Sequence, residues 1–169
     1  MNFNVSKWDK FCKLFSGKNF ITVSQLPAQR NNVDWIVVKH DVECHPSRAL
    51  RLAKIEAGHG IKATYFVQAN LLMPHLEIFK KIADLGHEVT YHYDVLDANK
   101  GNFEKALEEF KFMIEQFHQN GFSVQAKLRH ATSCVWEIAG GVLNMSSAAA
   151  AEPSNAFSNA ACAAGTSVV

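Results

Sequence analysis

Side chains that can bind a metal ion or transfer a proton follow three of the four main apolar runs that the sequence predicts as strands. Acids and imidazoles dominate these positions, and both serve as metal ligands and as general acids or bases. The strand predicted at 63–67 differs, because the amides Gln68 and Asn70 follow it. The residues after the other strands are His40, Asp41, Glu43, Cys44 and His45 after 35–38, His92, Tyr93 and Asp94 after 88–91, and Arg129 and His130 after 123–128.

These side chains can form one site only if the strands are parallel. The carboxyl ends of parallel strands lie at one edge of a sheet, where ligands and catalytic groups gather. The acids and imidazoles would then converge on one site. We expect His40 to point to the opposite face from Asp41, because side chains alternate along a strand. His87 precedes its strand, at the wrong edge, and is expected to be a turn or packing residue.

Helices and strands are predicted to alternate along the first 130 residues. Helices are expected where apolar residues recur every three or four positions before a glycine, and strands where short continuous apolar runs suit a buried parallel sheet. This alternation favours an α/β fold with parallel strands. A complete (β/α) barrel needs about 250 residues, so we expect a partial barrel. The predicted helices are 5–15, 46–56, 75–85 and 102–118, and the predicted strands are 20–23, 35–38, 63–67, 88–91 and 123–128.

Composition narrows the class of protein. Seventeen Lys and Arg residues against sixteen Asp and Glu residues leave a net charge of +1, which makes nucleic acid or an anionic membrane an unexpected partner. Hydrophobic residues make up 48% of the chain, enough for a buried core. No run reaches the roughly 20 apolar residues of a membrane span, and the N-terminus lacks the apolar centre of a signal peptide. Four widely spaced cysteines are expected to be reduced thiols. These features predict a folded cytoplasmic protein.

The amino-acid composition of the chain changes near residue 138. Of its 33 charged residues, only Glu152 lies in the last 32 positions, where Ala and Ser dominate. We therefore predict a folded domain over 1–137 and an irregular, low-complexity tail over 138–169 that is disordered or foreign to the fold. A partial barrel also leaves sheet edges unpaired, and such edges favour self-association.

An ordered set of motifs resembles the polysaccharide deacetylase family, carbohydrate esterase family 4. The similarity runs from about Trp8 to His130 and is closest to the branch whose first motif is His-Asp-Val-Asp. It covers most of the predicted domain, which makes it more specific than one short motif. The segments that carry it are 37–43, Pro46, 49–50, 52–53, 55–56, 60–66, 85–89 and 91–93.

The resemblance implies a distorted (β/α) barrel with one divalent metal, usually zinc, that removes N- or O-acetyl groups from carbohydrates. In the first motif, Asp41 matches the general base, and Glu43 stands where the branch has a metal-binding Asp. In the second motif, His92 matches the first metal-binding histidine. Leu96 occupies the position of the second histidine. The metal therefore needs a third ligand from elsewhere, because catalytic zinc generally has three protein ligands and an open water site.

His130 is the preferred third ligand, with Asp94, Asp97 or Asp41 as alternatives. Arg129 falls near the third motif of the family, where an arginine orients the catalytic acid. Tyr93 and Asp94 follow the metal histidine and are the predicted substrate-binding residues. The late motifs of the family would lie beyond Ile138, in the segment that matches nothing in it.

Two functions remain open. The first is a metal-dependent hydrolase that deacetylates a polysaccharide or a glycan precursor. The second is a truncated, catalytically inactive fragment that only binds carbohydrate, which Leu96, Glu43 and the missing late motifs favour. A barrel phosphoesterase is a weaker third possibility, because His40 is not followed by a second histidine two positions later.

Overall fold

A computed structural model describes residues 4–29 and 34–124, together with the backbone of four short segments further along the chain. Those segments are residues 128–129, 136–138, 141–143 and 166–168. Helices and strands alternate through the described residues, and three successive strands are separated by helical connections. The α/β prediction is therefore confirmed as a mixed fold built on an open parallel sheet.

The helices begin and end close to their predicted positions. Apolar spacing located them because each buries one face against the sheet or against another helix. The main helices are α1 (Val5–Phe15), α2 (Pro46–Gly58), α4 (Leu76–Asp84) and α6 (Phe103–Gln119). Short helices complete the set: the 3-10 helices η1 (Val23–Gln29) and η2 (Met73–His75), and the single turns α3 (Ala69–Leu72) and α5 (Val95–Ala98).

The strands form a sheet in the order β4-β3-β2-β1-β7. Strands β1 to β4 are parallel to their neighbours, whereas β7 pairs with β1 in the antiparallel direction. A separate antiparallel pair joins β5 to β6. The strands are β1 (Val38–Val42), β2 (Ala63–Gln68), β3 (Glu88–Tyr93), β4 (Leu128–Arg129), β5 (Trp136–Ile138), β6 (Gly141–Leu143) and β7 (Thr166–Val168).

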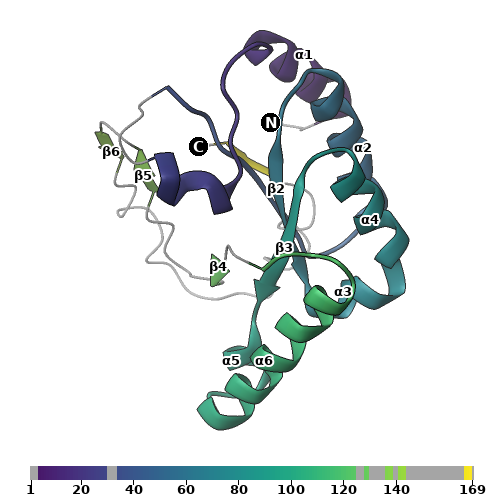
Figure 1. Ribbon diagram of the computed structural model, residues 1–169, viewed down its shortest axis with the longest axis vertical. Helices are drawn as coiled ribbons and strands as arrows, with labels where there is room; N and C mark the ends of the chain where they lie inside the picture. The colour runs from purple at the N-terminus through teal and green to yellow at the C-terminus, as the bar shows by residue number, and fades with distance from the viewer. Residues whose placement is uncertain are drawn as a thin grey trace.

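The two faces of the sheet are covered differently. Helices α1, α2 and α4 lie side by side on one face, to the right in Figure 1, and α2 packs against both of the others. The core lies between this layer and the sheet and includes Val38, Ala53, Val67 and Phe79. On the other face lies η1, the dark blue helix in Figure 1, which meets the sheet where the amide of Val23 donates to Thr64 Oγ1 (2.9 Å).

Two strand predictions differ from the structure. The segment predicted as a strand at 20–23 makes one isolated bridge, Phe20 to Ile36, and then continues into η1. The first long strand covers 38–42 rather than 35–38, because its pairing with β2 starts at Val38 opposite Ala63. Asp41 therefore lies inside β1 instead of after it. In the same way β3 extends through His92 to Tyr93.

Local capping fixes the ends of the helices. The side chain of Asn4 accepts from the amide of Lys7 at the start of α1, and Pro46 occupies the first turn of α2, where no amide donor is needed. Gly86 and Gly121 follow α4 and α6 with φ angles of 91° and 87°. A side chain at either position would be strained, so glycine ends these helices at low cost.

We expect Asn102→Ala to lower the free energy of unfolding by about 1 kcal/mol. Asn102 caps α6, where its Oδ1 accepts from the backbone amide of Lys105 at 3.1 Å, and alanine would leave that amide without its side-chain acceptor. Urea unfolding followed by circular dichroism measures the change. Asn102→Asp is the matched control and should retain stability, because aspartate caps equally well; equal losses in both variants would contradict the capping role.

The C-terminal region departs from the expected irregular tail at the described positions. Residues Thr166–Val168 form β7 and pair with β1, so the edge of β1 that was expected to be open is paired. Strand β5 crosses the boundary that was predicted at residue 137. Among the helices of the described residues, none combines the length and apolar composition that crossing a bilayer requires.

Candidate functional site

The two faces of the sheet differ in chemistry. His40 of β1 points to the helical layer, because its ring nitrogen lies 2.7 Å from a carboxylate oxygen of Glu56 in α2. Its neighbours Lys39 and Asp41 must point to the opposite face, since side chains alternate along a strand. The expected orientation of His40 is confirmed.

The pairing register extends this polar face across β2 and β3. Lys39, Thr64 and Glu88 lie level with one another, and Asp41, Phe66 and Thr90 form the next row. Gln68 pairs with His92 in the row after that, and Glu43 follows the last paired residue of β1 at the same level. Parallel strands in register point level residues to the same side. The carboxyl end of this face therefore holds Glu43, Gln68 and His92.

Glu43 and His92 meet across the end of β2. Glu43 Oε1 lies 3.5 Å from His92 Nε2, although their strands are not neighbours in the sheet. The His92 side chain is 2% exposed and that of Glu43 is 26% exposed, so the pair is accessible from the Glu43 side. The predicted closeness of these two residues is confirmed, and their role as metal ligands stays a prediction.

This separation suits a shared cation. Two donors bound about 2.0–2.1 Å from a zinc ion at a tetrahedral angle lie about 3.4 Å apart. The observed 3.5 Å between Glu43 Oε1 and His92 Nε2 matches that spacing. Within the described residues, however, no group of three His, Cys, Asp or Glu side chains is placed to hold a metal. The pair could supply two of the three protein ligands that a catalytic zinc centre generally has.

Asp41, the predicted base, forms an ion pair with Lys39. Lys39 Nζ lies 3.1 and 3.4 Å from the two carboxylate oxygens and 5.9 Å from the centre of the Phe66 ring. Both charged side chains remain partly exposed, at 12% for Lys39 and 28% for Asp41. Asp41 stands one row below Glu43 on the same face, and Lys39 orients its carboxylate. Its role as a general base stays a prediction.

Tyr93, one of the two predicted substrate-binding residues, points to the helical side of the sheet, and substrate binding by Tyr93 and Asp94 stays a prediction. The Tyr93 ring packs edge-on against Phe110 of α6 at 5.0 Å and lies 6.2 Å from Tyr91, on the helical side of the sheet. Alternation along β3 explains this, because Tyr93 follows His92 and must point the other way. Asp94 is exposed at the start of α5.

Leu96, which the resemblance places at the position of a metal-binding histidine, packs against the core. Its side chain is half-buried against the hydrophobic core, so α5 offers an apolar group where the family motif has a histidine. Arg129 pairs with Tyr93 through the backbone of β4, which places β4 beside the end of β3. His130, the preferred third ligand, lies outside the described residues.

A buried network around Glu56 was not predicted. Glu56 is 0% exposed, and its Oε1 accepts from Trp8 Nε1 at 2.9 Å and faces His40 Nε2 at 2.7 Å. Its Oε2 accepts from the Tyr65 hydroxyl at 2.7 Å. Burial alone would raise the pKa of Glu56, but the charge and hydrogen bond of His40, with the bond from Tyr65, hold it below its ordinary value. Glu56 is therefore a buried carboxylate.

One signal in the sequence could have revealed Glu56. Ala49, Ala53 and Glu56 are spaced by four and three residues, and all three are buried on one face of α2. An acid in the apolar stripe of a helix must find buried donors, because an unpaired buried charge is too costly. The nearest polar groups on the facing strands are those of His40 and Tyr65.

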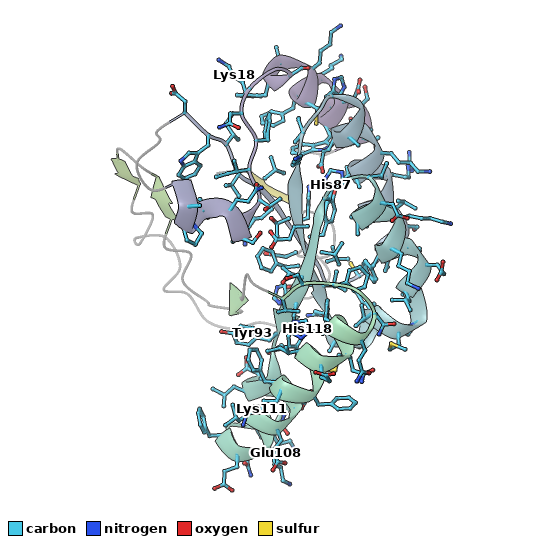
Figure 2. All side chains as sticks on the ribbon, viewed as in Figure 1. Lys18, His87, Tyr93, Glu108, Lys111 and His118 are labelled. Atoms are coloured by element: carbon cyan, nitrogen blue, oxygen red, sulfur yellow. The ribbon has the colours of Figure 1, made fainter. Side chains whose placement is uncertain are left out.

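His87 beside this network is neutral. Its Nδ1 accepts from the amide of Ala63 (3.1 Å), so its proton must be on Nε2, which donates to the carbonyl of Ala53 (2.9 Å). Burial lowers the pKa of His87, despite the nearby Glu56 and the Ala53 carbonyl. The 3.9 Å approach of Nδ1 to Glu56 Oε2 is therefore a contact and not an ion pair. The packing role predicted for His87, labelled at the amino end of β3 in Figure 2, is confirmed.

The described cysteines differ from each other. Burial, followed by the charges of Glu56 and Asp9, raises the pKa of the Cys12 thiol to about 12, so this thiol stays protonated. Cys12 is a free thiol, as expected, and has no thiolate character for catalysis. Cys44 is disulfide-bonded, which corrects the expectation that it is reduced.

No family model, curated protein or solved structure matches the chain. The resemblance to the polysaccharide deacetylases therefore stays a prediction. What the site can do follows from its own geometry: a carboxylate and an imidazole at cation-sharing distance, with a second carboxylate on the same face.

Proposed function

We propose that the polar face of the sheet carries a hydrolytic centre in which Glu43 and His92 hold a divalent metal, zinc by preference. The reaction we assign to it is the removal of N- or O-acetyl groups from a carbohydrate. The 3.5 Å approach of Glu43 to His92 at the carboxyl ends of two parallel strands is the observation that carries the proposal. The order of the motifs from Trp8 to His130 supplies the reaction class.

Each residue of the centre has a separate task. A bound divalent ion would lower the pKa of a water ligand toward about 7 and polarise the acetyl carbonyl. Asp41 would accept the proton of the attacking water on a carboxylate lone pair that Lys39 leaves open. Lys39 keeps that carboxylate in one orientation through its contacts of 3.1 and 3.4 Å. The side chains of Glu43 and Asp41 are 26% and 28% exposed, so both carboxylates can be reached from solvent.

We expect purified chain to bind one Zn²⁺, and Glu43→Ala and His92→Ala each to weaken binding at least 100-fold. Each variant removes one of the two identified ligands from the shared ion. Isothermal titration calorimetry measures affinity, and acetate release from an acetylated oligosaccharide measures activity. Glu108→Ala and His118→Ala, which remove the same chemical groups from exposed positions on α6 (Figure 2), should behave as wild type. A wild-type chain that binds no divalent metal would refute the proposal.

A second function is favoured by Leu96. An apolar side chain packed on the core at the place of a metal ligand is what a non-catalytic, carbohydrate-binding descendant would have. Such a protein would bind an oligosaccharide in EDTA as tightly as with zinc and would release no acetate. The same titration, performed with and without zinc, separates the two functions.

A further inference from the structure

Gln68 is the last residue of β2, the strand between the two that carry Glu43 and His92. It pairs directly with His92, and the preceding Val67 pairs with Val42, the residue before Glu43. Val67 is fully buried in the core beneath the helices. Gln68 therefore points to the polar face, between the two residues of the proposed metal site.

The carboxamide of Gln68 is available for a ligand. It makes no capping bond to α3, which starts at the next residue, and among the described residues it forms no other hydrogen bond. The side chain is half-buried, so it lies at the boundary between protein and solvent. A glutamine oxygen is a neutral donor that divalent cations accept beside carboxylates.

The proposed centre lacks a third ligand among the charged or imidazole groups of the described residues. Asp41, paired with Lys39, is the general base of the proposed function, Leu96 is apolar, and Asp94 is exposed beyond the end of β3. Gln68 is the remaining oxygen donor in the row of Glu43 and His92. Its place in that row comes from backbone pairing.

We infer that Gln68 Oε1 is the third protein ligand of the divalent cation held by Glu43 and His92, an inference that rests on the proposed function. The ligand set then contains two oxygens and one nitrogen, with one negative charge. Imidazole ligands favour zinc, whereas carboxylate and carbonyl oxygens suit manganese. A site of this composition should discriminate less between Zn²⁺ and Mn²⁺ than one with two histidines.

The test is calorimetric titration of the whole 169-residue chain with Zn²⁺ and with Mn²⁺, in the absence of substrate. Gln68→Leu and Gln68→Ala should each lose at least 10-fold in affinity for both ions. Gln68→Glu should bind both ions at least as tightly as wild type, because a carboxylate is a stronger ligand. Gln68→His should gain affinity for Zn²⁺ relative to Mn²⁺. Urea unfolding in EDTA establishes that each variant is folded.

Gln68→Glu separates a ligand from a residue that merely supports Glu43. A supporting amide would donate its N–H to the carboxylate, and glutamate would replace that donor with a repelling charge and weaken binding. Asn70→Leu, which removes an exposed amide from the same connection, is the matched control and should bind as wild type.

The two proposals fail in distinguishable ways. If wild type binds no metal, the proposed function is refuted and the ligand assignment with it. If Glu43→Ala and His92→Ala lose the metal while Gln68→Leu and Gln68→Ala keep wild-type affinity, the metal centre stands and the assignment of Gln68 is overturned. Weaker binding by Gln68→Glu also overturns it. Loss in the leucine and alanine variants with retention in the glutamate variant supports it.

Discussion

Glu56→Ala is expected to lower the free energy of unfolding by about 3–5 kcal/mol. Removing one partner of a buried charged network leaves the others without compensation, which costs far more than losing a surface pair. Here the orphaned groups would be the indole of Trp8, the imidazole of His40 and the hydroxyl of Tyr65, all held within 2.9 Å of the carboxylate oxygens. Alanine also leaves a cavity where the carboxylate was.

A matched pair of variants separates charge from packing at this position. Glu56→Gln keeps the shape but offers only one accepting oxygen, so we expect an intermediate loss of about 1–3 kcal/mol. Glu77→Ala removes an exposed glutamate from α4 and should change stability by less than about 0.5 kcal/mol. Urea unfolding at pH 7 measures all three. A loss below 1 kcal/mol for Glu56→Ala would show that the network does not hold the fold together.

The sequence predicted the main helices and the strands β2 and β3 close to their bounds, but it missed features that are set by pairing between distant segments. Helix α1 matches its predicted bounds, 5–15, because its apolar stripe and its Asn4 cap both depend only on residues that are close together in the sequence. The apolar run at 35–38 was misplaced as a strand, because the extent of β1 is set by its register with β2. Strand β7 could not be foreseen, since the pattern of residues 166–168 says nothing about a partner more than 100 positions away.

The residues of the candidate site also differ in how far the sequence could predict their positions. Glu43 and His92 were predicted to meet because parallel strands end at one edge, and that rule needs only the order of the elements. Gln68 also follows a predicted strand, but a neutral amide in a sequence does not by itself indicate a metal ligand. Tyr93 was predicted to follow the strand, whereas β3 continues through it and alternation turns its side chain to the helical side.

Acid is expected to destabilise the fold through the groups buried beneath the helices. The pKa values of Glu56 and His87 both lie below the ordinary values of 4.5 and 6.5 in the folded chain. The unfolded chain therefore binds more protons than the folded chain once the pH falls below those values. The contribution of these two groups to the free energy of unfolding is fully present above pH 6.5. It declines below that pH, first through protonation of His87 and then, below 4.5, through protonation of Glu56. Each group can contribute a slope of at most about 1.4 kcal/mol per pH unit.

His87→Gln isolates the first of these steps. Glutamine can accept from the amide of Ala63 and donate to the carbonyl of Ala53, as His87 does, but it cannot be protonated. Wild type should lose up to about 1.4 kcal/mol between pH 7.5 and 5.5 through this group, and the variant should lack that loss. Urea unfolding across this range measures it, with the exposed His118→Gln expected to keep the wild-type dependence. Parallel curves for wild type and His87→Gln would mean that His87 takes up its proton equally in the folded and unfolded chains, and its buried, neutral tautomer would then be wrong.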